Sequence, residues 1–213
     1  MISDIFTYPF RGTGKYILII GAVLSLLLSL GTYFPFLGFI LAICASGYFS
    51  AYMFKIINST ACGFEEACDW PDFRDFFGDL IVPWLCMLSA SFFSFGPYVI
   101  ISSFFEGAGI LSYALLILGV IHMPMAILCV ALSQAMRSAF WANTIPKILD
   151  SLPQYLFIVL LFGGLSLLSR MLNKALDAIP VLGWFFSYFM GMYTLMVTGR
   201  MLGLFYRDNS NPV

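Results

Sequence analysis

Residues 80–105 read LIVPWLCMLSASFFSFGPYVIISSFF and contain no Asp, Glu, Lys or Arg. The hydrocarbon core of a bilayer is about 30 Å thick, so a helix of roughly 20 apolar residues crosses it. Four other stretches are equally free of charge: Tyr16–Phe54, Gly107–Met136, Ser151–Ser169 and Ala178–Gly199. Since the first of these four is long enough for two crossings, the sequence predicts six transmembrane helices.

The composition indicates the same environment. Hydrophobic residues make up 61% of the 213 residues and charged residues 10%, against about 25% charged in an ordinary soluble domain. A soluble fold of this size buries only about 70–75% of its surface, so we expect lipid to surround much of the chain. The net charge is −1 and gives no field that attracts nucleic acid. We therefore expect membrane lipid as a partner and no nucleic acid.

The predicted fold class is all-α: a polytopic membrane helix bundle of six transmembrane helices arranged as three hairpins, with short interfacial amphipathic helices. Residues 1–213 form a single integral membrane domain in this prediction. The expected spans are residues 16–34, 36–57, 80–104, 109–133, 153–172 and 180–206.

The positive charges predict the orientation. With the N-terminus in the cytoplasm, eight Lys and Arg residues lie inside and only Arg170 and Lys174 lie outside, and such an excess is typical of cytoplasmic loops. We therefore expect a multi-pass protein of the cell (inner or cytoplasmic) membrane with cytoplasmic N- and C-termini. The apolar run after Lys15 ends without a small-x-small cleavage pattern, so we interpret it as a retained signal anchor.

The connection at residues 58–79 is acidic and aromatic. Asp69 can cap a helix whose first turn contains Pro71, and Asp72 stands where a capping box has its second acid. We expect this helix to lie at the headgroup level with an aromatic face toward lipid. The candidate partner-docking or interfacial residues are Glu65, Glu66, Asp69, Trp70, Asp72, Phe73, Asp75 and Asp79.

Three interpretations of these acidic side chains stay open. They can form a solvated face with acid at a helix N-terminus, hold Mg²⁺ or Ca²⁺ through hard oxygen ligands, or bind a basic segment of a partner. Their spacing matches no EF-hand loop, so no metal site is predicted. Residues 134–151 form a second, weaker amphipathic segment, and the aromatic residues before Arg11 form a third interfacial piece.

One ionisable side chain, His122, lies in the middle of a predicted span, where such groups are costly and often functional. Pro124 follows and frees a backbone carbonyl from its helical hydrogen bond. Either a neutral His122 bonds to a backbone carbonyl or a serine of a neighbouring helix, or it lines a cavity where Pro97 and Pro124 kink two spans. The other candidate cavity-lining residues are Ser89, Ser91 and Ser94.

Signatures of catalysis are missing from the sequence. It contains no H-E-x-x-H, G-x-S-x-G, P-loop or dinucleotide-binding pattern, and Cys62 and Cys68 have a spacing that matches no zinc site. We therefore expect no enzyme, no cofactor and inert thiols. Gly199-x-x-x-Gly203 is a close-packing signal, and it suits contacts within the bundle and contacts with a partner's helix equally.

Several features occur together along nearly the whole chain: Tyr8-Pro9, Gly47-Tyr48, the acidic loop Gly63–Asp79, Ala139-Phe140 and Tyr155. In this combination the sequence resembles an uncharacterised prokaryotic multi-pass membrane protein family, a domain-of-unknown-function family with an acidic Trp-containing cytoplasmic loop. The resemblance implies a small integral membrane protein without an assigned activity, so it supplies no catalytic residues. Cys62 and Cys68 do not belong to the family's pattern.

We therefore expect a non-enzymatic integral membrane protein that acts as a scaffold or accessory subunit of a membrane complex. Its partners would be other membrane protein subunits or a second copy of the chain. The alternative is a permease-like or lipid-handling protein with a cavity around the kinked third and fourth spans. An enzyme that acts on lipid headgroups through the acidic loop is a more distant alternative.

Overall fold

The computed structural model describes residues 2–31, 34–71, 74–105, 109–176, 179 and 182–210. These residues are largely helical and include no strand, which confirms the all-α class. The α-helices are α1 (Ile2–Thr7), α2 (Gly14–Leu30), α3 (Pro35–Ala61), α4 (Val82–Phe104), α5 (Gly109–Ser133), α6 (Trp141–Asp150), α7 (Leu152–Leu176) and α8 (Leu182–Ser210). Shorter elements include the 3-10 helices η1 (Tyr8–Phe10) and η4 (Met136–Ala139) and the π-helix η3 (Phe77–Ile81).

Several helices support a membrane-embedded protein. Those long and apolar enough to cross a bilayer alone are Phe36–Ala61, Phe77–Phe104, Gly109–Ser133 and Leu152–Leu176. A fifth crossing is added if Ser3–Phe10 and Gly14–Ser29, which are bent by 70° relative to each other, form one broken span. The described helices thus account for four or five crossings, and the six spans in three hairpins stay a prediction.

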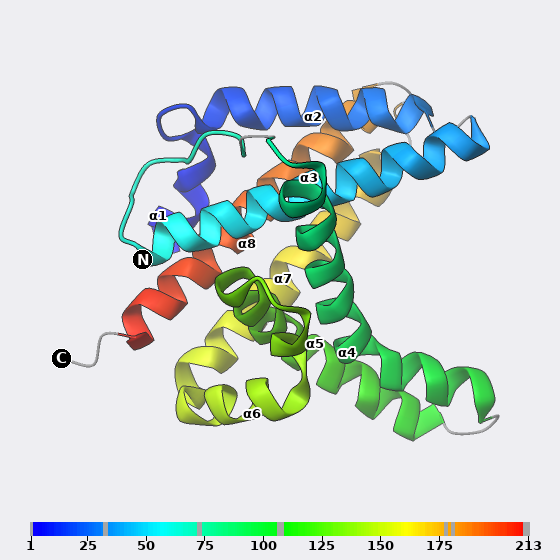
Figure 1. The fold of residues 1–213 in the computed structure, drawn as a ribbon, viewed down its shortest axis with the longest axis vertical. Coiled ribbons are helices and arrows are strands. Elements are labelled where there is room, and N and C mark those ends of the chain that lie inside the picture. The colour runs from blue at the N-terminus through cyan, green and yellow to red at the C-terminus, as the bar shows by residue number, and fades with distance from the viewer. Residues whose placement is uncertain are drawn as a thin grey trace.

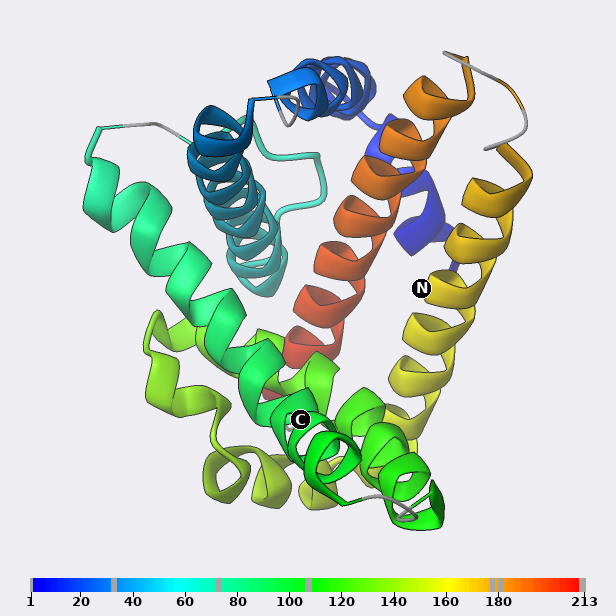
Figure 2. The same ribbon diagram turned by 90° about the vertical axis from the view of Figure 1, so that its right-hand side faces the viewer.

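Helix α8 lies at the centre of the bundle, which explains its less apolar composition. It packs against α2, α3 and α7 and also touches α1 and α5, and Figures 1 and 2 show it running between α3 and α7. Polar side chains within a membrane protein face the bundle interior rather than lipid. A helix enclosed by protein therefore tolerates the polar residues that a lipid-facing helix excludes.

Helices α4 and α5 pack together as a pair and diverge from the other long helices toward the lower right of Figure 1. Helix α1 lies at the left of the same view together with the C-terminal ends of α3 and α8, and α6 lies below them. The first helix and the end of the last helix therefore lie on one side of the bundle.

Two glycines bring α8 close to α3. A Cβ added at Gly199 would lie 3.0 Å from the Ile56 side chain, and one added at Gly203 would lie 2.5 Å from the Thr60 Cβ. The contact at Gly203 would force atoms to shift, because real Cβ atoms essentially never approach so closely, and the contact at Gly199 would be tighter than most real Cβ contacts. The Gly-x-x-x-Gly pattern therefore serves packing within this chain, which decides between the two interpretations that the sequence leaves open.

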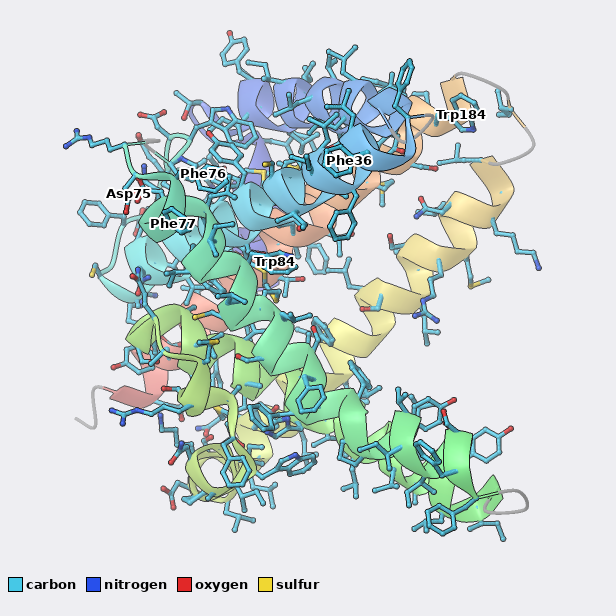
Figure 3. The ribbon with its side chains drawn as sticks, turned by 45° about the vertical axis from the view of Figure 1, so that its right-hand side comes forward. Phe36, Asp75, Phe76, Phe77, Trp84 and Trp184 are labelled. Carbon is cyan, nitrogen blue, oxygen red and sulfur yellow. The ribbon has the colours of Figure 1, made fainter. Side chains whose placement is uncertain are left out.

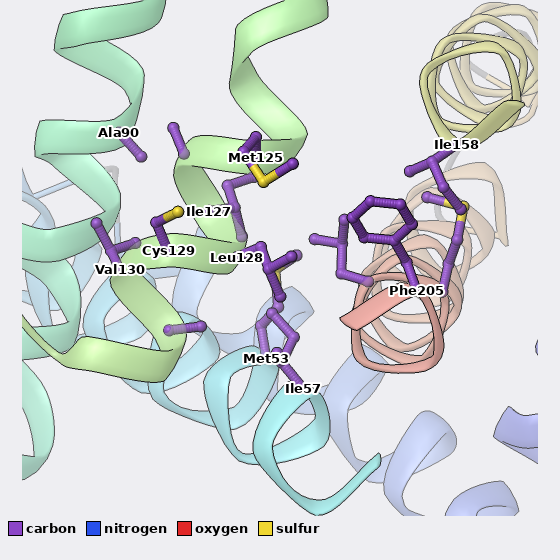
Figure 4. Packing of buried hydrophobic residues seen from close by; sticks show 14 of the residues in the cluster. Met53, Ile57, Ala90, Met125, Ile127, Leu128, Cys129, Val130, Ile158 and Phe205 are labelled. Carbon is purple, nitrogen blue, oxygen red and sulfur yellow. The ribbon is translucent and has the colours of Figure 1, made fainter. Parts of the chain in front are cut away.

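The core lies where α3, α5, α7 and α8 meet. One cluster of buried side chains joins these helices (Figure 4). It includes Met53 of α3, Met125 and Leu128 of α5, Ile158 of α7 and Phe205 of α8. Unbranched Met side chains fill irregular gaps between helices that cross at different angles.

A side chain from α7 bonds to the backbone of α5 beside Pro124. The hydroxyl of Tyr155 donates to the Ile121 carbonyl and accepts the backbone N–H of Met125 at 3.2 Å. Tyr155, which is fully buried, therefore fixes α7 against α5 next to this proline.

The outward surface of the long helices is apolar. Ile110 is 91% exposed, Phe36 81% and Phe104 79%. Such side chains suit contact with lipid. Exposed aromatic residues at helix ends, such as Phe36 and Trp184 (Figure 3), are typical of the belts at membrane interfaces.

Candidate functional site

The acidic loop is not the predicted amphipathic helix. Residues 62–71 lie outside any helix, and helical structure resumes only at Phe76. The prediction of a helix capped by Asp69 is therefore wrong. Asp72 and Phe73, which belong to that prediction, lie outside the described residues.

The loop instead follows α3, because Trp70 packs on that helix. Its ring stacks on Tyr48 with 5.6 Å between centroids and lies 4.9 Å from the ring of Tyr52. The Lys55 ammonium donates to the Trp70 carbonyl at 3.0 Å, and the Tyr48 hydroxyl donates to the Pro71 carbonyl at 3.4 Å. Aromatic burial against α3 thus outweighs the local preference for a helix.

The first half of the loop is fastened to the N-terminal segment. Thr13 donates to the carbonyl of the buried Ala67 at 3.4 Å, and the backbone N–H of Cys68 donates to the Tyr8 hydroxyl at the same distance. Burial raises the pKa of the Cys68 thiol, which keeps this sulfur in its less reactive, protonated form.

Two of the candidate carboxylates cap η3. Asp75 accepts the N–H of Phe77 at 3.3 Å and that of Gly78 at 2.9 Å. Asp79 accepts the N–H groups of Arg74 and Asp75, each at 2.9 Å. This reciprocal arrangement resembles a capping box, and it lies further along the chain than the sequence analysis placed it.

The remaining described candidates of the loop, Glu65, Glu66 and Asp69, are exposed. Within the described part of the chain, no group of three or more His, Cys, Asp or Glu residues could hold a metal ion. At the C-terminal end of the acidic loop, Phe76 and Phe77 are 46% and 69% exposed (Figure 3). Phe64, near the start of the loop, is 66% exposed, so these three rings are more outward than the partly buried Trp70.

The sequence analysis missed a buried arginine. Arg200 on α8 is 1% exposed, and it donates to the same carboxylate oxygen of Asp4, from Nε at 3.1 Å and from Nη2 at 2.9 Å. Its Nη1 donates to the Phe64 carbonyl at 2.6 Å and to the Thr60 hydroxyl at 3.4 Å. One side chain therefore joins α1, α3, α8 and the start of the acidic loop.

The charge of Arg200 is balanced by its surroundings. The Tyr8 ring lies 5.0 Å from the guanidinium, close enough for a cation–π interaction. Partial burial raises the pKa of Asp4, but the guanidinium groups of Arg200 and Arg11 outweigh it and hold that pKa below 3.8. The available sequence signal was Arg200 itself, since a charge within a predicted span requires a partner.

His122 is enclosed by α4, α5 and α6. Its Nδ1 and Nε2 lie 2.8 Å from the hydroxyls of Ser94 and Thr144, and its ring stacks on Trp141 with 4.1 Å between centroids. The Trp141 indole N–H in turn donates to the Phe93 carbonyl at 2.7 Å. His122 therefore makes the hydrogen bond to a serine of a neighbouring helix that the sequence analysis gives as one interpretation.

The candidate serines do not form one group. Ser94 is buried beside His122, whereas Ser89 donates to the Met136 carbonyl of η4 at 3.3 Å and Ser91 bonds to a carbonyl of its own helix. Ser89 and Ser94 thus join helices, a role that serines often have in membrane proteins.

Comparisons with known proteins found no matching family model, no matching curated protein and no matching solved structure. The family resemblance derived from the sequence therefore stays a prediction.

Proposed function

We propose that this protein is a non-enzymatic integral membrane scaffold or accessory subunit, which presents its acidic loop to a basic segment of a partner subunit. The observation that carries this proposal is the anchoring of the loop. Trp70 fixes it to α3, while Glu65, Glu66 and Asp69 remain exposed. A binding surface that is already ordered loses little conformational entropy on association.

The buried polar groups support the same proposal. Arg200 binds α1, α3 and the loop, and His122 binds α4 and α6, so the hydrogen-bonding groups of both side chains are occupied by contacts within the chain. These contacts fix helices relative to one another. A fixed arrangement suits a protein whose role is to position a partner.

We place the scaffold in the cell membrane with six crossings, and with both termini and the acidic loop in the cytoplasm. The ratio of eight to two positive charges supports this orientation. A second support is that α1 and the C-terminal end of α8 lie on the same side of the bundle (Figure 1).

Purification from native membranes in gentle detergent tests the scaffold. A partner should be retained by the wild-type protein and lost from the triple variant Glu65→Gln, Glu66→Gln, Asp69→Asn, which leaves the Trp70 anchor intact. The matched control is Asp208→Asn, because Asp208 is an exposed acid on α8. A wild-type protein that is a bare monomer, without partner or self-association, would contradict the proposal. Retention of the partner by the triple variant would contradict the role of the loop.

A pocket keeps the lipid-handling alternative as a second candidate. It measures about 240 Å³ and is lined by Met125 and Leu128 of α5 and by Lys147 of α6. It is not the cavity around the kinked third and fourth spans, because neither His122 nor a residue of α4 lines it. If the alternative with a cavity beside His122 holds, His122→Leu should abolish the flux of a substrate. Since His122 is 1% exposed and covered by Trp141, the scaffold function predicts lower stability of this variant without a change in flux.

A further inference from the structure

A second pocket, of about 260 Å³, lies where α3, the acidic loop, η3 and the end of α5 meet. Polar groups from three separate segments line it. The lining side chains include Phe54, Lys55, Asn58, Asp79, Pro83 and Gln134.

The α3 side of the pocket carries hydrogen-bond donors. The Lys55 ammonium uses one N–H for the Trp70 carbonyl at 3.0 Å and has two more to offer. The Asn58 amide uses one N–H for the Ala131 carbonyl at 3.1 Å and retains the other. These donors suit an anionic oxygen, such as that of a phosphate.

The opposite side carries a carboxylate. Asp79 uses Oδ2 for the backbone N–H groups of Arg74 and Asp75, and a carboxylate has a second oxygen that accepts further donors. The ion pairs between described residues include none between Asp79 and Lys55. The pocket thus holds a cation and a carboxylate that are not neutralised by each other.

The backbone around the pocket is unusual on both flanks. Gln134, which lines the pocket, has φ of 50°, a left-handed conformation that is uncommon for any residue except glycine. Asp79 lies in the π-helix Phe77–Ile81, an element found frequently at functional sites.

We propose that this pocket binds the zwitterionic phosphoethanolamine headgroup of an amine-bearing phospholipid, with the ammonium against Asp79 and the phosphate against Lys55, Asn58 and Gln134. An anion alone would leave Asp79 without a partner, and an amine alone would leave Lys55 without an anionic partner, so a ligand with both charges complements both groups.

The position of the pocket favours a lipid over a free zwitterion. Phe54 and Pro83 give the pocket an apolar part, and the exposed rings of Phe76 and Phe77 stand beside Asp79 in the chain. Exposed aromatic side chains are typical of the headgroup level of a bilayer. This inference goes beyond the scaffold function and does not depend on it.

Lipid titration of the purified, delipidated full-length protein tests this site, with bound lipid counted by native mass spectrometry. Phosphatidylethanolamine should bind about tenfold or more tightly than phosphatidylcholine, whose quaternary amine donates no hydrogen bond, and than phosphatidylglycerol, which has no amine. Free phosphoethanolamine should compete only weakly, because it lacks the acyl chains. Equal affinity for the three phospholipids would overturn the proposal, and tight binding of free phosphoethanolamine would overturn the assignment to lipid.

Two variants locate the binding at this pocket. Asp79→Asn retains an oxygen that can cap η3 and should lose the preference for phosphatidylethanolamine over phosphatidylcholine. Gln134→Gly suits the left-handed backbone, so it should fold at least as well as the wild type and bind phosphatidylethanolamine severalfold more weakly. Asp208→Asn is the control and should bind like the wild type. Wild-type preference and affinity in both pocket variants would overturn the proposal.

Discussion

Replacing Asp4 with Asn should destabilise the protein, because it leaves the Arg200 guanidinium buried without its counter-charge. Arg200 has a side chain that is 2% exposed, and Asp4 supplies the carboxylate 2.9 Å from its Nη2. Two of the four described hydrogen bonds of the guanidinium end on Asp4.

The size of the effect follows from this geometry. Removing one partner of a buried ion pair costs about 3–5 kcal/mol. The Asp4 side chain is 24% exposed, so solvent can replace part of the lost interaction, and Asn keeps one acceptor oxygen. We therefore expect a loss of about 2–3 kcal/mol in the free energy of unfolding. The double variant Asp4→Asn, Arg200→Met also removes the buried charge, and it should be less destabilised than the sum of the single variants by about 1–3 kcal/mol.

Equilibrium unfolding of the full-length protein in mixed SDS and detergent micelles measures these differences. The control is Asp208→Asn, because the Arg207–Asp208 pair, at 3.6 Å, is half exposed on its acidic side and should contribute at most about 1 kcal/mol. The reasoning is refuted if Asp4→Asn unfolds like the control, or if the effects of the two single substitutions simply add.

Three further predictions use the same assay. The pKa of Asp4 lies below 3.8 in the folded protein, so the stability it contributes should be complete above that pH and disappear as the pH falls through the lower folded value; Asp4→Asn should lack this acid-dependent loss. Gly203→Ala would put a Cβ 2.5 Å from Thr60 and should cost about 1–3 kcal/mol, whereas the control Gly191→Ala, which meets nothing within 4 Å, should be neutral or slightly stabilising. Tyr155→Phe removes the hydroxyl that bonds to two backbone groups of α5 and should cost about 1–3 kcal/mol, because buried hydrogen bonds between α7 and α5 are lost.

The helical class could be predicted from the sequence because lipid imposes a simple local rule, a long run without charge. The contact at Gly203 could also be anticipated in kind, since glycine spacing within a span marks close packing. Its partner helix, α3, could not, because any neighbouring helix would satisfy the pattern. Similarly, the sequence allowed a serine partner for His122, but not the choice of Ser94 and Thr144.

The errors come from tertiary contacts that local rules do not contain. The residues around Asp69 fit a helix start, yet the Trp70 ring gains more by packing on Tyr48 and Tyr52 of α3. The pairing of Asp4 with Arg200 joins opposite ends of the chain, and no periodicity links such distant positions. The distribution of Lys and Arg predicted only that Arg200 lies on the cytoplasmic side. In the structure its side chain is buried.

Labelling of Cys62 decides whether this protein is a membrane bundle whose acidic loop faces the cytoplasm. Cys62 is an exposed free thiol at the start of the loop, so a membrane-impermeant maleimide and peptide mapping can be applied to the wild-type protein. A cytoplasmic loop predicts labelling of Cys62 in inside-out vesicles and none in intact cells. Labelling of Cys62 in intact cells, or recovery of the protein from the soluble fraction, would contradict it.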